Sequence, residues 1–281
     1  MSSSPSSSNS DKTFTLDPSA NLAAQTTYKT RLTTGVKDAA GNNLTSQYET
    51  SNGFTASSKF LRGGSIQGLD MSLARVVTTF AGSASNFGST NATGTSARFR
   101  NPAGLTTDVT NLYVADYYNH AIRKIVISTG VVTTLAGTVG TYGSADGTGT
   151  GAGFKFPNSL TTDGTNIYVT DKDNHIIRKI VISTGVVTTL AGTAGTTGFS
   201  DGTGGAAKFL YPTGITLVGN NLYVSDYFNH SIRKIVISSG VVTTLAGTAL
   251  SSGSTDATGA SARFNKPVGI TTDGTNLYVA E

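Results

Sequence analysis

The sequence of 281 residues contains no cysteine and no tryptophan. The lack of cysteine excludes disulfide bonds, zinc–thiolate sites and a thiol nucleophile, and it leaves the redox compartment undetermined. No apolar stretch approaches the roughly 20 residues needed to cross a bilayer, so we expect no membrane span. The N-terminus, MSSSPSSSNSDK, has neither the basic start nor the apolar core of a secretion signal, so no export route is visible in the chain.

Charge is also scarce, because only 13% of the residues are charged. The 20 Lys and Arg residues against 16 Asp and Glu leave a net charge of +4, and a dedicated nucleic-acid binder would concentrate its basic residues on one face. We therefore predict no nucleic-acid partner. Glycine is abundant, with 34 residues, and runs of Val, Ile and Thr between Gly and Asp signals predict an all-β chain with many tight turns.

The most informative feature is a repeat with a fixed period of 55 residues. The segment VVTT begins at Val76, Val131, Val186 and Val241, and no insertion breaks the register. The same spacing relates Pro102, Pro157, Pro212 and Pro267. A fixed period of this kind is typical of solenoids, propellers and arrays, in which each unit packs against its neighbours.

One unit contains the signals for four strands, which we call a to d in chain order. In the second unit they are expected at residues 161–162, 166–170, 176–183 and 186–192, with short hairpins at Asp163-Gly164 and Thr184-Gly185. Consecutive apolar residues in the third strand, Ile180 to Ile182, require both faces of the sheet to be covered. A four-stranded antiparallel sheet packed on both faces by copies of itself is a propeller blade, so the predicted fold is a β-propeller of about four blades.

The stretch PxGITTDGTNLYVADxxNHxIRKI recurs with small changes from the first three of these prolines and is cut short after Pro267. It resembles the NHL repeat, including the Asp-x-x-Asn-His turn of that family, over residues 76–281. The third residue of the name-giving triplet departs from Leu, being Ala121, Ile176 or Ser231. The resemblance implies a β-propeller, commonly six-bladed, and for a bacterial protein an extracellular, cell-surface or periplasmic location.

Both ends of the repeat region are incomplete. The fourth unit stops at Glu281, before its strand c, and VVTTFAG from Val76 is predicted to be a strand d without its own strands a to c. That lone strand could close a four-bladed ring that lacks one strand. The alternative, which we favour, is a fragment of a longer ring.

Ahead of the repeats, three further segments are expected. Residues 1–10 are rich in serine and are predicted to be a flexible, disordered lead. Residues 11–57 resemble the C-terminal half of a bacterial Ig-like domain, with about three strands where a sandwich usually has seven. Residues 58–75 are predicted to link this partial domain to the propeller, with Gly63-Gly64 as a hinge.

Antiparallel connectivity predicts that the d-to-a crossovers and the b-to-c turns share one face. The crossovers run for about twenty residues, and loops of that length are uncommon unless they are functional or structured. The candidate ligand-binding face consists of Asp116, Asn119, His120, Asp171, Asn174, His175, Asp226, Asn229 and His230. The alternative is structural: Asp and Asn hold the turn backbone, His is a solvated edge residue, and the strand-c arginines, Arg123, Arg178 and Arg233, pair with the turn Asp.

Two other residue sets recur with the period. Asp146, Asp201 and Asp256 lie in DGTG or DATG stretches, which superficially resemble calcium loops but lack the closing Glu of an EF-hand. Turn chemistry is the favoured interpretation, and we predict no metal and no cofactor. Phe99, Phe154, Phe209 and Phe264 are predicted to lie in the core between blades.

These features favour a non-catalytic repeat scaffold that binds protein or carbohydrate through the crossover face, on an exported bacterial protein. A purely architectural spacer fits the sequence equally well. An enzyme needs non-equivalent groups at one point, whereas near-identical repeats present the same residues in a ring. A metal-dependent gluconolactonase-like hydrolase would place carboxylates at the central channel, but strand a begins with GLTT, SLTT, GITL and GITT, which supply only hydroxyls.

Overall fold

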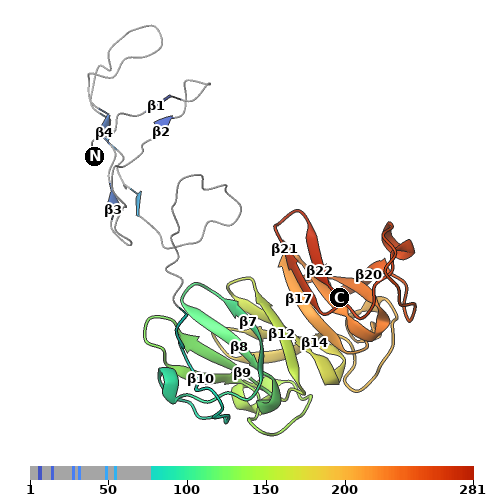
Figure 1. Cartoon of the computed structure of the whole chain (residues 1–281), viewed down its shortest axis with the longest axis horizontal. Helices are drawn as coiled ribbons and strands as arrows, with labels where there is room; N and C mark the ends of the chain where they lie inside the picture. Colours follow the sequence, from blue (N-terminus) through green and yellow to red (C-terminus); the bar gives the residue numbers. More distant parts are fainter. Residues whose placement is uncertain are drawn as a thin grey trace. The chain divides into compact units, whose positions relative to one another are not determined.

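The structure is a computed structural model that describes residues 77–281 and, before them, six two-residue strands (Figure 1). These short strands are β1 (Ser6–Ser7), β2 (Phe14–Thr15), β3 (Thr27–Tyr28), β4 (Arg31–Leu32), β5 (Tyr48–Glu49) and β6 (Phe54–Thr55). They pair antiparallel as β1 with β2, β3 with β6 and β4 with β5. The predicted lead, the partial Ig-like domain and the linker otherwise lie outside the described residues.

Residues 77–281 form three antiparallel sheets and one hairpin, in step with the 55-residue period. The first sheet contains β7 (Pro102–Thr107), β8 (Asn111–Asp116), β9 (Ala121–Val126) and β10 (Val132–Ala136). The second contains β12 (Pro157–Thr162), β13 (Asn166–Asp171), β14 (Ile176–Val181) and β15 (Val186–Ala191). The third contains β17 (Pro212–Val218), β18 (Asn221–Asp226), β19 (Ser231–Val236) and β20 (Val241–Gly247). The hairpin is β21 (Gly269–Thr272) with β22 (Leu277–Ala280).

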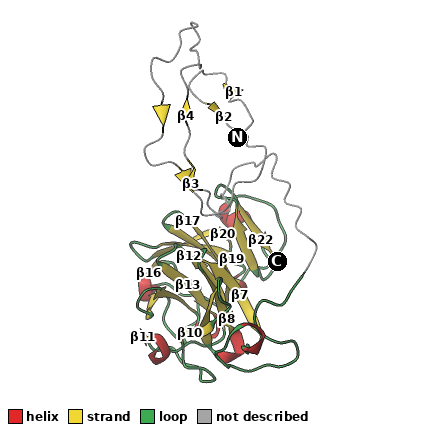
Figure 2. Cartoon of the chain, turned by 90° about the vertical axis from the view of Figure 1, so that its left-hand side faces the viewer, coloured by secondary structure: helices red, strands yellow, loops and turns green. Residues whose placement is uncertain are grey.

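Each sheet is a propeller-like blade whose strands are the predicted a, b, c and d. The first strands of successive units lie beside one another, β7 next to β12, β12 next to β17 and β17 next to β21. Figure 2 shows that strands dominate this part of the chain and that its helices are short turns. The prediction of an all-β fold of propeller blades is therefore confirmed.

The crossovers are more ordered than long loops, which the sequence did not predict. The two-residue strands β11 (Gly147–Thr148) and β16 (Gly202–Thr203) pair with β15 and β20, so two blades gain a fifth strand at the outer edge. Four 3-10 turns lie in the crossovers: η1 (Gly94–Ser96), η3 (Gly149–Gly151), η5 (Gly204–Ala206) and η7 (Gly259–Ser261). After η3 the chain doubles back, and the N–H of Gly153 donates to the carbonyl of Ala145 at 3.0 Å.

The blades pack face to face through apolar side chains supplied by both neighbours. Phe154 and Phe209 are fully buried in the two clusters between complete blades, which confirms their predicted core position. The first of these clusters joins Tyr113, Ala115, Ile122 and Ala136 of one blade to Phe154, Leu160, Ile167 and Val169 of the next. At the inner strands the approach is so close that a Cβ on Gly104 would lie 2.6 Å from the carbonyl oxygen of Asn158.

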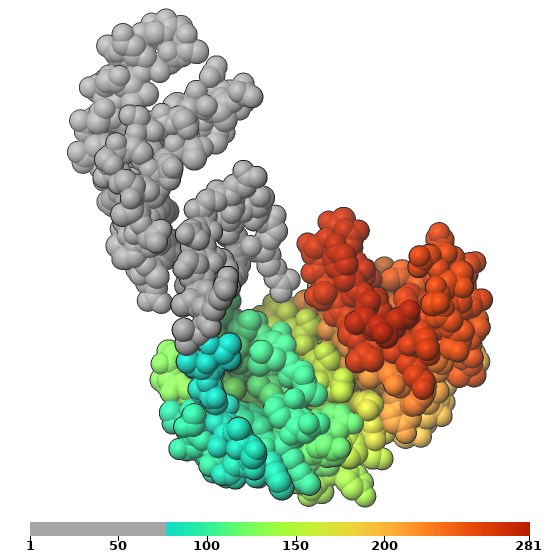
Figure 3. Space-filling model, in the orientation of Figure 1, coloured from blue at the N-terminus to red at the C-terminus, as the bar shows by residue number. Residues whose placement is uncertain are grey.

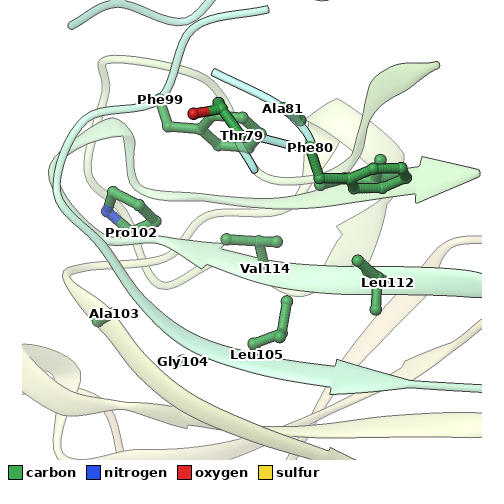
Figure 4. A pocket seen from close by; sticks show the side chains of 11 residues that line it. Thr79, Phe80, Ala81, Phe99, Pro102, Ala103, Gly104, Leu105, Leu112 and Val114 are labelled. Atoms are coloured by element: carbon green, nitrogen blue, oxygen red, sulfur yellow. The ribbon is translucent and has the colours of Figure 1, made fainter. Parts of the chain in front are cut away.

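The predicted strand d at residues 76–82 is wrong, because Val77–Phe80 has no strand structure and Val77 is 98% exposed. A strand d needs a strand c to pair with, and no described strand pairs with residues 77–82. Its Phe80 and Ala81 instead line an apolar hollow on the first blade together with Phe99, Leu105 and Val114 (Figure 4).

The four units form an open arc. The hairpin β21–β22, red in Figures 1 and 3, stands apart from β7. Leu105 in the first blade is 61% exposed, whereas Leu160, its equivalent in the second blade, is 4% exposed. Within the described residues the four units therefore do not close into a four-bladed ring.

The first a-to-b hairpin keeps the bonding of the second although its Asp-Gly dipeptide is altered to Asp-Val. Asp108 accepts hydrogen bonds from the N–H groups of Thr110 and Asn111 and from the Tyr113 hydroxyl, at 2.9, 2.7 and 2.6 Å. Burial opposes ionisation of this carboxyl, but the hydrogen bonds together hold the pKa of Asp108 below its ordinary value. Val109 follows with φ of 80°, where the second blade has Gly164 at 89°. A β-branched residue in this region is strained.

Replacing Val109 with glycine is therefore expected to raise the free energy of unfolding by about 1 kcal/mol, because glycine adopts positive φ without steric cost. Urea unfolding of the full chain measures the change. Thr110→Gly, one residue further on, serves as the control and should be neutral or destabilising. Equal or lower stability of Val109→Gly relative to the wild type would contradict the strain at this hairpin.

Candidate functional site

The b-to-c turns and the crossovers meet on one face, as antiparallel connectivity predicts; we call it the turn face. The turns are the 3-10 segments η2 (Tyr117–Asn119), η4 (Lys172–Asn174) and η6 (Tyr227–Asn229). In the second blade the Asp173 N–H donates to the Lys155 carbonyl, and the Gly195 N–H of the next crossover donates to the Asn174 carbonyl, both at 3.1 Å.

Beneath each turn lies a buried arginine–aspartate pair. Arg178 and Asp171 are fully buried with 3.2 Å between Nη1 and Oδ2, and the equivalent distances for Arg123–Asp116 and Arg233–Asp226 are both 2.8 Å. The predicted pairing of strand-c arginines with the turn Asp is thus confirmed. Burial raises the pKa of Asp171 to about 6, against the lowering effects of hydrogen bonds from Asn174 and the Lys155 N–H and of the Arg178 charge.

The turn asparagines connect these pairs to the crossovers. Asn174 Nδ2 donates to Asp171 Oδ2 at 2.8 Å and to the Gly143 carbonyl at 2.6 Å, and Asn119 and Asn229 make the same two bonds. All three asparagine side chains are buried. The predicted Asp and Asn site residues therefore lie under the surface of the turn face, with these polar atoms bonded within the protein.

A second acceptor reaches each arginine from the crossover, which sequence reasoning missed. Asp146 Oδ1 lies 2.9 Å from Arg178 Nη2 and accepts from the Thr189 hydroxyl at 3.0 Å. Asp201 bonds Arg233 and Thr244 in the same way. The signal was present in the sequence, since Asp146 and Asp201 each precede the arginine by 32 residues. These carboxylates tie the crossover to strand c.

The histidines end the turns in a left-handed conformation, with φ between 53° and 59°. His120 Nδ1 accepts from the Phe156 N–H at 3.2 Å, and His175 Nδ1 accepts from the Tyr211 N–H at the same distance, which links each turn to the next unit. His120 and His175 are both 7% exposed, so they are not the solvated edge residues of the structural alternative. Burial lowers the pKa of both, which agrees with an Nδ1 that accepts a hydrogen bond.

Above this bonded layer lies a continuous series of aromatic and cationic side chains, which sequence reasoning also missed. Its members come from the variable positions of the repeat, above all from the two residues between Asp and Asn in the DxxNH turn. We call it the aromatic–cation band. Its members are Phe87, Arg100, Tyr117, Tyr118, Phe156, Lys172, Tyr211, Phe228 and Lys266.

Several members of the band are open to solvent. Phe87 is 72% exposed, Tyr118 45% and Phe228 38%, and Tyr142 beside the band is 66% exposed.

Within residues 77–281, no three His, Asp or Glu side chains converge in a way that could hold a metal ion. The helices found in the described part of the chain are too short to span a membrane.

Comparisons with known proteins agree with this architecture. The family model for a bacterial Ig-like domain matches residues 1–56, which includes the predicted lead. Protein SUPPRESSOR OF QUENCHING 1 of Arabidopsis thaliana is 34% identical over 153 residues, covering 50% of this chain and 14% of that protein. NHL repeat-containing protein 2 of Homo sapiens is 31% identical over 180 residues, covering 59% of this chain and 25% of that protein. The chain therefore spans a quarter or less of these two relatives.

Among solved structures, an auxiliary nutrient binding protein from Bacteroides thetaiotaomicron superposes with a TM-score of 0.51. The two chains are 20% identical, and the match covers 66% of this chain and 46% of the other. A likeness at this identity shows a shared fold and carries no ligand across.

Proposed function

We propose that this chain is a non-catalytic binding scaffold, because residues 76–281 carry NHL repeats folded as propeller blades. In the sequence these repeats follow a segment similar to a bacterial Ig-like domain. The turn face of the chain binds a protein or a glycan. The observation that carries the proposal is the aromatic–cation band, in which exposed rings and charged groups lie on a layer of buried hydrogen bonds. Such a rigid support limits the ordering cost of binding.

The nine Asp, Asn and His residues of the turns form this support in the proposal. They hold the b-to-c turns and the crossovers in one arrangement, and the neighbouring side chains of the band make the ligand contacts. Aromatic and arginine side chains are enriched among residues that dominate binding energy at interfaces. This separation of supporting residues from ligand-contacting residues explains why the turn residues are repeated in every unit while the residues of the band vary between units.

An enzymatic role has less support from the geometry. The carboxylates of the turns are neutralised by the strand-c arginines, for example Asp116 by Arg123 at 2.8 Å, so they are not presented to a substrate. An active site needs a nucleophile, a base and a charge stabiliser at one point.

The proposed setting is a protein that is extracellular, on the cell surface or in the periplasm, and the similarity of residues 1–56 to a bacterial Ig-like domain supports it.

The test is to probe protein and glycan arrays with the full chain and with variants on opposite faces. Combined Phe87→Ala and Tyr142→Ala substitutions remove exposed rings at the turn face, and the captured signal is expected to fall about tenfold. Ile127→Ala, at an exposed position on the c-to-d hairpin of the opposite face, is the control and should leave capture unchanged. Equal losses in both variants would contradict the assigned face, and no capture by the wild type would favour the spacer.

A further inference from the structure

The geometry points to an acidic polysaccharide as the ligand of the turn face, and this inference rests on the function proposed above. Sugar rings stack their C–H faces on exposed aromatic rings of the band, and uronate carboxylates pair with its lysine and arginine groups. Charge-assisted hydrogen bonds between such cations and carboxylates are about twice as strong as neutral ones.

The first argument is the continuity of the band across all four units. Arg100 lies 5.6 Å from the ring centroids of Phe87 and Tyr118, and Tyr118 is 5.6 Å from Phe156. Phe156 is 4.9 Å from Tyr117. The first blade and its crossover are thus linked by contacts shorter than 6 Å, which makes one surface from residues that lie far apart in the sequence.

The series continues through Lys172, which bridges units. Its ammonium lies 5.5 Å from the Tyr117 ring of the first blade and 5.9 Å from the Tyr211 ring that precedes the third. Tyr211 is 5.4 Å from Phe228, and Lys266 of the fourth unit lies 5.5 Å from Phe228. A band that extends across several blades matches an extended polymer better than a small molecule, since equivalent weak contacts add by multivalency.

The second argument is the sign of the charge on this surface. Arg100, Lys155, Lys172 and Lys266 form no salt bridge within residues 77–281. The turn aspartates are buried and paired with arginine, and the half-exposed Asp146 and Asp201 of the crossovers pair with Arg178 and Arg233. Asp173 is the one other acid in the three turn segments. The charged members of the band are therefore all cations, which suits an anionic ligand.

The third argument separates a glycan from single-stranded nucleic acid. Neutralising a nucleic-acid backbone takes several basic contacts, and the affinity scales with their number. Here the four cations come from three of the four units and alternate with rings, and the whole chain carries only +4. An acidic polysaccharide carries widely spaced carboxylates between sugar faces that can stack on rings. It fits this pattern better than a nucleic acid, which carries one phosphate per nucleotide.

The test measures binding of the full chain to polygalacturonate by titration calorimetry, with highly methyl-esterified pectin as a probe of the same sugar without most of its charge. We expect binding to polygalacturonate, weakening as salt is raised, and affinity for the esterified polymer that is lower by about tenfold or more. Lys172→Gln and Tyr118→Ala should each weaken binding by roughly fivefold to tenfold. Lys179→Gln, on strand β14 and outside the band, is the matched control.

Each other result would overturn the inference in a recognisable way. Equal affinity for both polymers would refute the acidic ligand but leave a glycan-binding turn face in place. Binding of oligo(dT) without binding of polygalacturonate would assign the band to nucleic acid. If neither polysaccharide binds, the inference fails, and the array experiment with Phe87 and Tyr142 decides the proposed function separately.

Discussion

Replacing Arg178 with methionine is expected to lower the free energy of unfolding by about 3–5 kcal/mol, the usual cost of leaving a buried ion without its partner. The fully buried guanidinium lies 3.2 Å from Asp171 and 2.9 Å from Asp146. It also donates to the carbonyls of Gly153 and Ala145, at 2.6 and 2.9 Å. Methionine fills part of the volume but leaves the buried carboxylate of Asp171 without its counter-charge. It also removes the donor to the Gly153 carbonyl and one of the two donors to the Ala145 carbonyl.

Urea unfolding of the full chain at neutral pH, followed by circular dichroism, measures the effect of Arg178→Met. Lys179→Met is the matched control, because Lys179 is the next residue on strand β14 and is only half-buried. The control should change stability by less than about 1 kcal/mol. Equal effects at the two positions would mean that the arginine does not hold the crossover and the turn together.

Replacing Phe209 with alanine should also cost about 3–5 kcal/mol, because truncating a fully buried aromatic ring leaves a cavity. Phe209 is completely buried in the cluster between the second and third blades, and Arg233 lies 5.2 Å above its ring centroid. The loss therefore reports directly on packing between blades. If the units were independent, the ring would contribute little.

Phe199 offers the matched control for Phe209, since it lies in the same crossover and is 52% exposed. Phe199→Ala is expected to change the free energy of unfolding by less than about 0.5 kcal/mol. Thermal unfolding of both variants gives the comparison. A loss below about 1 kcal/mol for Phe209→Ala would contradict a close-packed interface between blades.

Much of this fold is predictable from sequence because its signals are local and occur several times. Alternating and consecutive apolar residues define strands b and c, and the Asp-Gly and Thr-Gly dipeptides place their turns. The position of Arg178 in strand c and of Asp171 in the turn was enough to predict their pairing. By contrast, β11 contains only Gly147 and Thr148, which have no strand signal of their own and pair because the next blade offers a free edge.

The false strand at residues 76–82 has the complementary explanation. Its sequence is almost that of β20, but a strand d forms by hydrogen bonding to strand c. No described strand c lies beside residues 77–82. Local propensity was correct and the tertiary partner was missing. The same reason limits prediction of the site: Lys172 meets Tyr117 and Tyr211 only because blades curve around an axis, so the band is invisible in any single unit.

The central claim is that successive units stand side by side around an axis and present one turn face. The absence of cysteine allows pairs of spin labels at Thr110→Cys, Thr165→Cys and Asn220→Cys, equivalent exposed positions at the a-to-b hairpins. Pulsed electron–electron double resonance should give narrow distributions of the distance between labels. The 110–165 and 165–220 distances should be similar, and the 110–220 distance should be clearly shorter than their sum. Broad distributions, or a 110–220 distance equal to that sum, would contradict the arrangement of the units as propeller blades.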